Sequence, residues 1–127
     1  MSLQSPLGRV LGKGSAKTGA GHWWAQRLTA VAMVPLGLWF VLALLGLQHG
    51  NYQMVAAWVA EPANSILLIL LVLTLVYHSC LGLQVVIEDY VHGATKIITL
   101  VVMQFVHVIM AVGGIYAVVV LSIGAAG

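Results

Sequence analysis

Long apolar runs separated by short polar segments dominate the pattern along this chain. They cover about residues 28–47, 65–87 and 97–123. Each reaches or exceeds the roughly 20 residues that a helix needs to cross the hydrocarbon core of a bilayer. Backbone polar groups must find partners inside the membrane, so each run is expected to be a helix. The pattern predicts a single all-α integral membrane domain with three transmembrane helices, preceded by an N-terminal segment, residues 1–27.

The polar segments carry fewer signals. Leu3–Gly21 is rich in Gly and Ser without an apolar period, which predicts a flexible or partner-ordered tail. Trp23 and Trp24 stand just before the first run, where aromatic rings anchor a helix at the lipid headgroups. Trp58 lies between the first two runs and is expected on a short amphipathic turn.

Composition agrees with a lipid environment. The chain is 61% hydrophobic and 6% charged, with a mean hydropathy of +1.05, whereas a soluble domain has about a quarter of charged residues. Its basic residues form no patch with aromatic residues, so no nucleic-acid partner is expected. Cys80 is the single cysteine, which excludes an intrachain disulfide, an iron–sulfur cluster and a cysteine zinc site.

The charges predict an orientation. All basic side chains fall on one predicted side of the membrane: Arg9, Lys13, Lys17, Arg27 and Lys96. The positive-inside rule therefore puts the N-terminus and the Glu88–Lys96 turn on the cytoplasmic side, with the C-terminus in the periplasm. This predicts a multi-pass protein of the bacterial inner membrane.

His78 lies well inside the second run, where an ionisable residue is costly and is read as functional. A neutral imidazole in a membrane helix is a natural axial ligand of haem iron. Gly82, one turn further on, would leave room for a flat macrocycle, although close helix packing explains a glycine there equally well. The alternative is a histidine that hydrogen-bonds across a helix interface. A haem with two imidazole ligands would need the second from elsewhere.

Asp89 and Tyr90 follow His78 by eleven and twelve residues. Eleven helical steps give roughly 20° of net rotation and roughly 16 Å of rise, so His78 and Asp89 share a face. A phenol and a carboxylate at the end of a span could bind a quinone carbonyl and relay protons. The alternative is that Glu88, Asp89 and Tyr90 only end a helix at the water boundary.

Three further polar residues have two interpretations each. Arg27, at the mouth of the first span, suits a carboxylate such as a haem propionate, or it sets topology and extends to lipid phosphate. His22 is a similar candidate. His107 is interpreted as a structural residue that joins helices, with haem ligation as the rival role. His92 lies in a loop and could touch a cytoplasmic partner.

Two segments carry a family resemblance. The run from His78 to the Asp89-Tyr90 pair, and the segment His22-Trp23-Trp24-Ala25-Gln26-Arg27-Leu28-Thr29-Ala30, resemble the hydrophobic membrane-anchor subunits, D type, of succinate dehydrogenase, respiratory complex II. The resemblance covers essentially the whole chain, including the three spans and the cytoplasmic N-terminus.

The resemblance implies a set of roles. His78 would be one axial ligand of a b-type haem, with the other supplied by a companion C-type anchor. Tyr90 would hydrogen-bond ubiquinone on the cytoplasmic side, with Asp89 beside it. Arg27 and His22 would lie near the haem propionates. An iron–sulfur subunit and a flavoprotein subunit would dock on the cytoplasmic face, and succinate oxidation would take place in them.

Other functions stay open. An anchor of a quinol:fumarate reductase would show the same residues, and a cofactor-free structural or assembly subunit is the rival from another class. A small multidrug-type transporter is disfavoured because it needs a carboxylate within the membrane, whereas Glu88 and Asp89 lie at the edge of the second run.

Overall fold

The computed structural model describes residues 16–47 and 51–125, which form four helices. These are α2 (Ala16–Gly46), α3 (Tyr52–Ala60), α4 (Pro62–Tyr90) and α5 (Gly93–Ala125). Three segments are long and apolar enough to cross a membrane, namely Gly19–Gly46, Pro62–Tyr90 and Gly93–Gly124. The prediction of an all-helical protein with three spans is confirmed.

Helix α2 begins earlier than the apolar pattern indicated. Residues 16–21 are helical, so the prediction of a tail over Leu3–Gly21 is wrong for this part. The remainder of that segment, together with Arg9 and Lys13, lies outside the described residues. Extension of an existing helix adds one hydrogen bond per residue fixed, and Ala16, Lys17 and Ala20 have high helix propensity.

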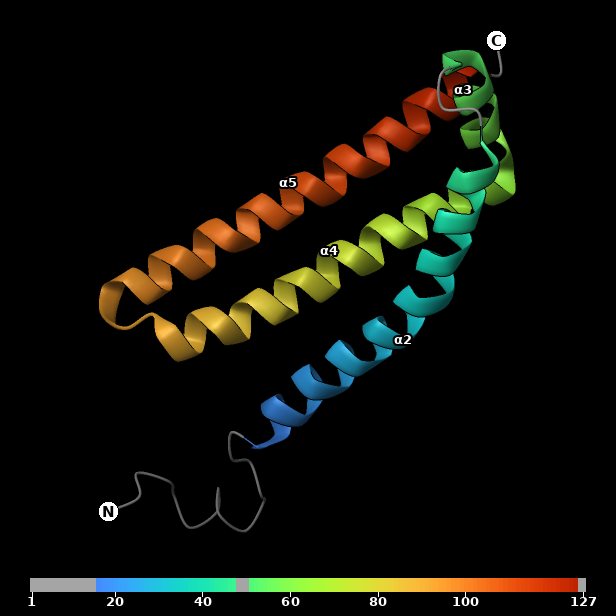
Figure 1. The fold of residues 1–127 in the computed structure, drawn as a ribbon. Helices are drawn as coiled ribbons and strands as arrows, with labels where there is room; N and C mark the ends of the chain where they lie inside the picture. The colour runs from blue at the N-terminus through green and yellow to red at the C-terminus, as the bar shows by residue number, and fades with distance from the viewer. Residues whose placement is uncertain (1–15, 48–50, 126–127) are drawn as a thin grey trace, which may run out of the picture.

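Helix α4 is the central element of the fold. It contacts α2 on one side and α5 on the other, and the short helix α3 packs against both α5 and α4. Within the described residues, the backbones of α2 and α5 do not approach each other. Figure 1 shows the start of α2 and the α4–α5 turn toward one end of the molecule, with α3 and the end of α5 at the other.

The reversal between α4 and α5 takes only two residues, Val91 and His92. Gly93 has a φ of 68°, in the left-handed region that glycine enters without steric cost. The Val91 amide donates to the Ile87 carbonyl oxygen at 2.9 Å. Lys96 Nζ donates to the Glu88 carbonyl oxygen at 3.2 Å, and a cation at a helix C-terminus stabilises it. These contacts hold α4 and α5 as a tight hairpin.

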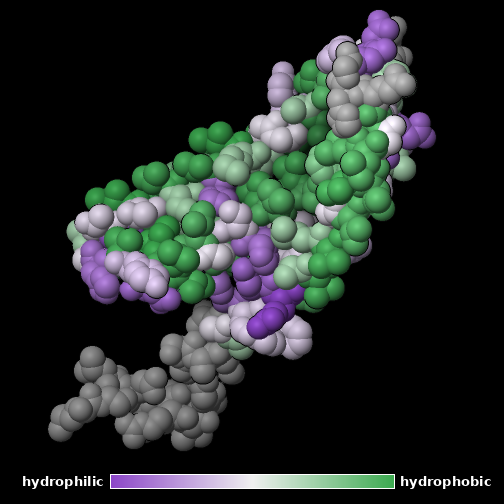
Figure 2. Space-filling model, in the orientation of Figure 1, coloured by the Kyte–Doolittle hydropathy of each residue, from purple (hydrophilic) through white to green (hydrophobic). Residues whose placement is uncertain are grey.

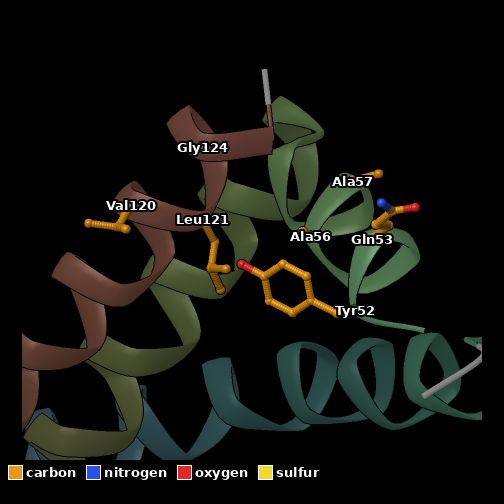
Figure 3. Close-up of a pocket in the computed structure, with 7 residues that line it drawn as sticks. All are labelled: Tyr52, Gln53, Ala56, Ala57, Val120, Leu121 and Gly124. Atoms are coloured by element: carbon orange, nitrogen blue, oxygen red, sulfur yellow. The ribbon is translucent and has the colours of Figure 1, made fainter. Parts of the chain in front are cut away.

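Helix α3 sits at the opposite end of the molecule. The Asn51 side chain caps it by accepting from the amides of Gln53 and Met54. Trp58 stacks on Trp39 of α2 with ring centroids 5.7 Å apart, so the predicted turn around Trp58 is confirmed as a short helix. A cavity of about 310 Å³ lies between α3 and α5, with Tyr52 pointing toward Leu121 (Figure 3).

The packed interior is small, and most large apolar side chains face outward. Figure 2 shows hydrophobic surface along the helices, with hydrophilic residues gathered mainly toward their ends. In water such a surface would drive aggregation. In lipid it needs no cover, because acyl chains are as apolar as the side chains.

Candidate cofactor site at His78

His78 is half-buried on α4 and faces α2. Its Nδ1 lies 2.9 Å from the hydroxyl oxygen of Thr29. Its Nε2 lies 3.4 Å from the side-chain nitrogen of Gln26, near the upper limit for a hydrogen bond. The imidazole therefore has a short hydrogen bond at Nδ1 and only a long contact at Nε2.

The bonds of Thr29 indicate which nitrogen of His78 carries the proton. The Thr29 oxygen lies 2.7 Å from the Ala25 carbonyl oxygen, one turn back along α2. A hydroxyl has one hydrogen, which the Ala25 carbonyl takes, so the Thr29 oxygen accepts from Nδ1–H. Nε2 then carries the lone pair and accepts from the Gln26 amide. Both contacts agree with this tautomer.

Two polar atoms near this part of α2 lack partners. Gln26 Oε1 and His22 Nε2 are shielded from solvent and find no hydrogen-bond partner within the described residues. A buried polar atom left unpaired costs about 1–3 kcal/mol. His22, Gln26 and Thr29 follow one another at helical spacings of four and three, so they form one stripe along α2. The described residues therefore leave part of the hydrogen-bonding capacity of this stripe unused.

Gly82 lies one turn beyond His78 on the same face of α4. A Cβ built there would have one neighbour within 4 Å, the Gln26 side-chain nitrogen at 3.5 Å. That neighbour is the end of a flexible side chain. A flat group beside His78 would therefore require Gln26 to turn away.

Arg27 is exposed, and its guanidinium carbon lies 5.3 Å from the centre of the Trp23 ring. This distance is typical of a cation–π contact. Arg27 shares the first half of α2 with His22 and Gln26, but no contact joins it to His78 among the described residues.

Asp89 and Tyr90 lie at the exposed end of α4, with Tyr90 80% exposed. They make no side-chain hydrogen bond within the part of the chain that the structure describes. Glu88, by contrast, accepts from the Gln84 amide at 2.9 Å. The structure thus keeps the Asp89–Tyr90 pair apart from the group around His78, by roughly 16 Å along the helix.

His107 is buried in the α4–α5 contact, only 6% exposed. Its Nδ1 lies 2.8 Å from the Met103 carbonyl oxygen and must donate to it. Its Nε2 lies 3.2 Å from the Ser79 hydroxyl and accepts from it. Both nitrogens are used inside the protein, as expected of a residue that joins two helices.

Sequence reasoning gave no role to Gln26, Thr29 or Ser79, which are the side chains that contact the two buried histidines. The spacing of His22, Gln26 and Thr29 was a usable signal, because these three polar residues recur on one face of an otherwise apolar helix. Ser79 offered no such signal beside its histidine neighbour.

Comparison with known proteins identifies the family of the chain. The family model described as succinate dehydrogenase/fumarate reductase transmembrane subunit matches residues 1–121. The chain belongs to this family. The resemblance stated from the His78–Tyr90 spacing is confirmed, and the chain is a multi-pass membrane anchor subunit.

Several relatives in the transmembrane-subunit family are similar to the chain. The succinate dehydrogenase hydrophobic membrane anchor subunit of Rickettsia bellii is 41% identical over 78 residues, 61% of this chain. That match spans 62% of the Rickettsia protein, less than two thirds of its length. The anchor subunit of Reclinomonas americana is 31% identical over 72% of this chain and 80% of its own length. That of Paracoccus denitrificans is 27% identical over 76% and 74%.

Proposed function

We propose that this chain is the D-type membrane anchor of a succinate:ubiquinone oxidoreductase. The names of the relatives support the choice of reaction, because each of the three proteins compared above is named for succinate dehydrogenase. The observation that carries the cofactor assignment is the weakly used lone pair of His78 Nε2. A quinol:fumarate reductase anchor is the second candidate, because the family description covers both enzymes.

The residues around His78 fit a b-type haem. His78 would supply the Nε2 lone pair to the iron, and Gly82 would leave the space beside it. Arg27 and His22 would meet the propionates, and His22 Nε2 lacks a partner within the described residues. When bound, such a haem supplies a one-electron redox centre inside the membrane. The second axial imidazole would come from a companion C-type anchor.

Tyr90 and Asp89 would form part of the ubiquinone site. Tyr90 would donate a hydrogen bond from its phenol to a quinone carbonyl, and Asp89 would help to pass protons from water. Their exposure at the end of α4 supports this role, because both side chains are free to meet a ligand or a second subunit there. An iron–sulfur subunit carrying the electrons and a flavoprotein subunit would dock at the same end.

The orientation follows from the charge pattern. Arg27 and Lys96 would face the cytoplasm, with α3 and the end of α5 in the periplasm. The two ends of the molecule in Figure 1 support this, because the start of α2 and the α4–α5 turn lie toward one end.

The quinone role is tested by Tyr90→Phe in the complete complex, with Tyr116→Phe as the matched control. Tyr116 is similarly exposed but lies within α5. Tyr90→Phe is expected to lower succinate:ubiquinone reduction by about 10²-fold or more, since a positioned acid contributes 10²–10⁴. Succinate oxidation with an artificial acceptor should persist. Equal loss of both activities, or equal effects of the two variants, would contradict the proposal.

The orientation is tested by thiol labelling in a Cys80→Ala background. Gly124→Cys has free space around the new Cβ, and Ala94→Cys lies exposed in the first turn of α5 at the other end. A membrane-impermeant maleimide added to intact cells with a permeable outer membrane should label Gly124→Cys alone. Labelling of Ala94→Cys alone would reverse the topology.

A further inference from the structure

We propose that Thr29 is a positioning residue for His78: its hydroxyl fixes the tautomer and plane of the imidazole and strengthens it as an iron ligand. This inference rests on the proposed haem ligation by His78. It assigns to the first helix a function in tuning the redox centre, in addition to meeting the propionates.

The local geometry carries the first step. Thr29 Oγ1 is held by its own helix, 2.7 Å from the Ala25 carbonyl oxygen and 3.1 Å from the Gln26 carbonyl oxygen. With its one hydrogen given to a carbonyl of its own helix, the Thr29 oxygen accepts from His78 Nδ1–H at 2.9 Å. In this arrangement the hydroxyl is the acceptor, and it favours the imidazole tautomer that carries its proton on Nδ1.

The second step concerns the nitrogen that remains. With Nδ1 protonated, Nε2 carries the lone pair that a metal requires. In the chain alone, that lone pair meets only the long contact with Gln26. The Gln26 amide would have to leave His78 Nε2 before that nitrogen could bind iron, and its own Oε1 has no partner within the described residues. Thr29 holds the ring, whereas Gln26 is easily displaced.

The third step is the effect on the ligand. A histidine that donates its other N–H to a fixed acceptor is oriented and becomes more basic. Greater electron donation from Nε2 favours ferric over ferrous iron, which lowers the reduction potential. Loss of the acceptor should therefore raise the potential and loosen the haem.

Thr99 provides a matched control on α5. Its hydroxyl makes the same bond to the carbonyl one turn back, Thr95, at 2.8 Å. Within the described residues it contacts no histidine. A comparison of Thr29→Val with Thr99→Val therefore separates the acceptor role from the general loss of a threonine hydroxyl in a membrane helix.

The test uses the complete complex, with haem content and redox titration of the haem as readouts. Thr29→Val is expected to lower haem affinity by about 10-fold or more, the usual cost of losing such a partner, and to shift the midpoint potential positively. Thr29→Ser should restore both properties, and Thr99→Val should match the unaltered complex. Thr29→Val with unchanged affinity and potential would overturn the proposal.

Two further comparisons keep the result interpretable. If Thr29→Val does not assemble, Thr29→Ser and Thr29→Cys are compared, because a thiol is a weaker acceptor than a hydroxyl; equal potentials would refute the role of Thr29. His78→Ala separates the two proposals. Loss of the b-type spectrum there, with an unchanged Thr29→Val complex, would refute only the inference about Thr29. A retained spectrum in His78→Ala would refute the ligation and this inference together.

Discussion

The two faces of α4 carry the same kinds of residue but use them differently. Toward α5, His107 has a hydrogen-bond partner on each nitrogen, and one of them is Ser79 of α4. Toward α2, His78 has one firm partner and one long contact. A histidine deep in a membrane helix is therefore not informative by its depth. What distinguishes a candidate ligand is a lone pair that the chain itself does not use well.

Two glycines, Gly114 in the α4–α5 contact and Gly82 in the α2–α4 contact, show the same difference between the two faces of α4. A Cβ at Gly114 on α5 would lie 2.7 Å from the Val72 side chain of α4, closer than real atoms approach. A Cβ at Gly82 would make only an ordinary contact with the Gln26 side chain. Gly114 is required for α4 and α5 to pack closely, as small residues are in membrane helix pairs. Gly82 faces only the end of the flexible Gln26 side chain, which can move aside.

The largest effect is expected from the two histidines. His78→Ala should abolish the reduced-minus-oxidised b-type spectrum of the purified complex, because the iron would lose an axial ligand. His107→Ala should keep the spectrum and lower stability, since an interhelical hydrogen bond in a membrane contributes about 0.6 kcal/mol and at most about 1.7. If His107→Ala lost the spectrum and His78→Ala kept it, His107 would be the haem ligand and His78 the structural residue.

An intermediate effect is expected from the two glycines, each changed to alanine. Gly114→Ala should destabilise the complex by about 1–3 kcal/mol through overpacking, because the branched Val72 side chain has little rotamer freedom. Gly82→Ala should leave thermal stability of the protein scaffold within about 0.5 kcal/mol and instead lower the ratio of haem to protein. Thermal unfolding and haem assays on both variants check this, and equal destabilisation by the two would remove the distinction.

The smallest effect is expected from Ser79→Ala, which removes the donor to His107 Nε2. The cost should be about 0.6 kcal/mol, the average for such bonds. In a His107→Ala background the same change should cost almost nothing, because contacting residues show non-additive effects. A full additional loss in the double variant would show that Ser79 acts independently of His107.

The helices were predictable from the sequence because hydropathy over 20 residues reports directly on a membrane span. The ends were less so: α2 begins at Ala16 rather than near Leu28, since a helix can extend into water at little cost. The depth of His78 in its span led to its prediction as a site residue, but His107 is as deep in the next span, so depth alone does not separate the two. The spacing of His22, Gln26 and Thr29 marks a polar face of α2, but it does not tell which helix that face meets, so the contacts of Thr29 and Gln26 with His78 were not predictable.

The backbone of α2 packs against α4 and does not approach α5 in the described part of the chain, which has a consequence for engineering. Substitutions that tighten the α4–α5 hairpin would raise robustness during detergent extraction without touching the cofactor region. Substitutions that strengthen the α2–α4 contact would also raise this robustness, but they would do so by filling the space between Gln26 and Gly82. A variant selected only for thermal stability, without a measurement of haem content, is therefore expected to be more stable but to bind less haem.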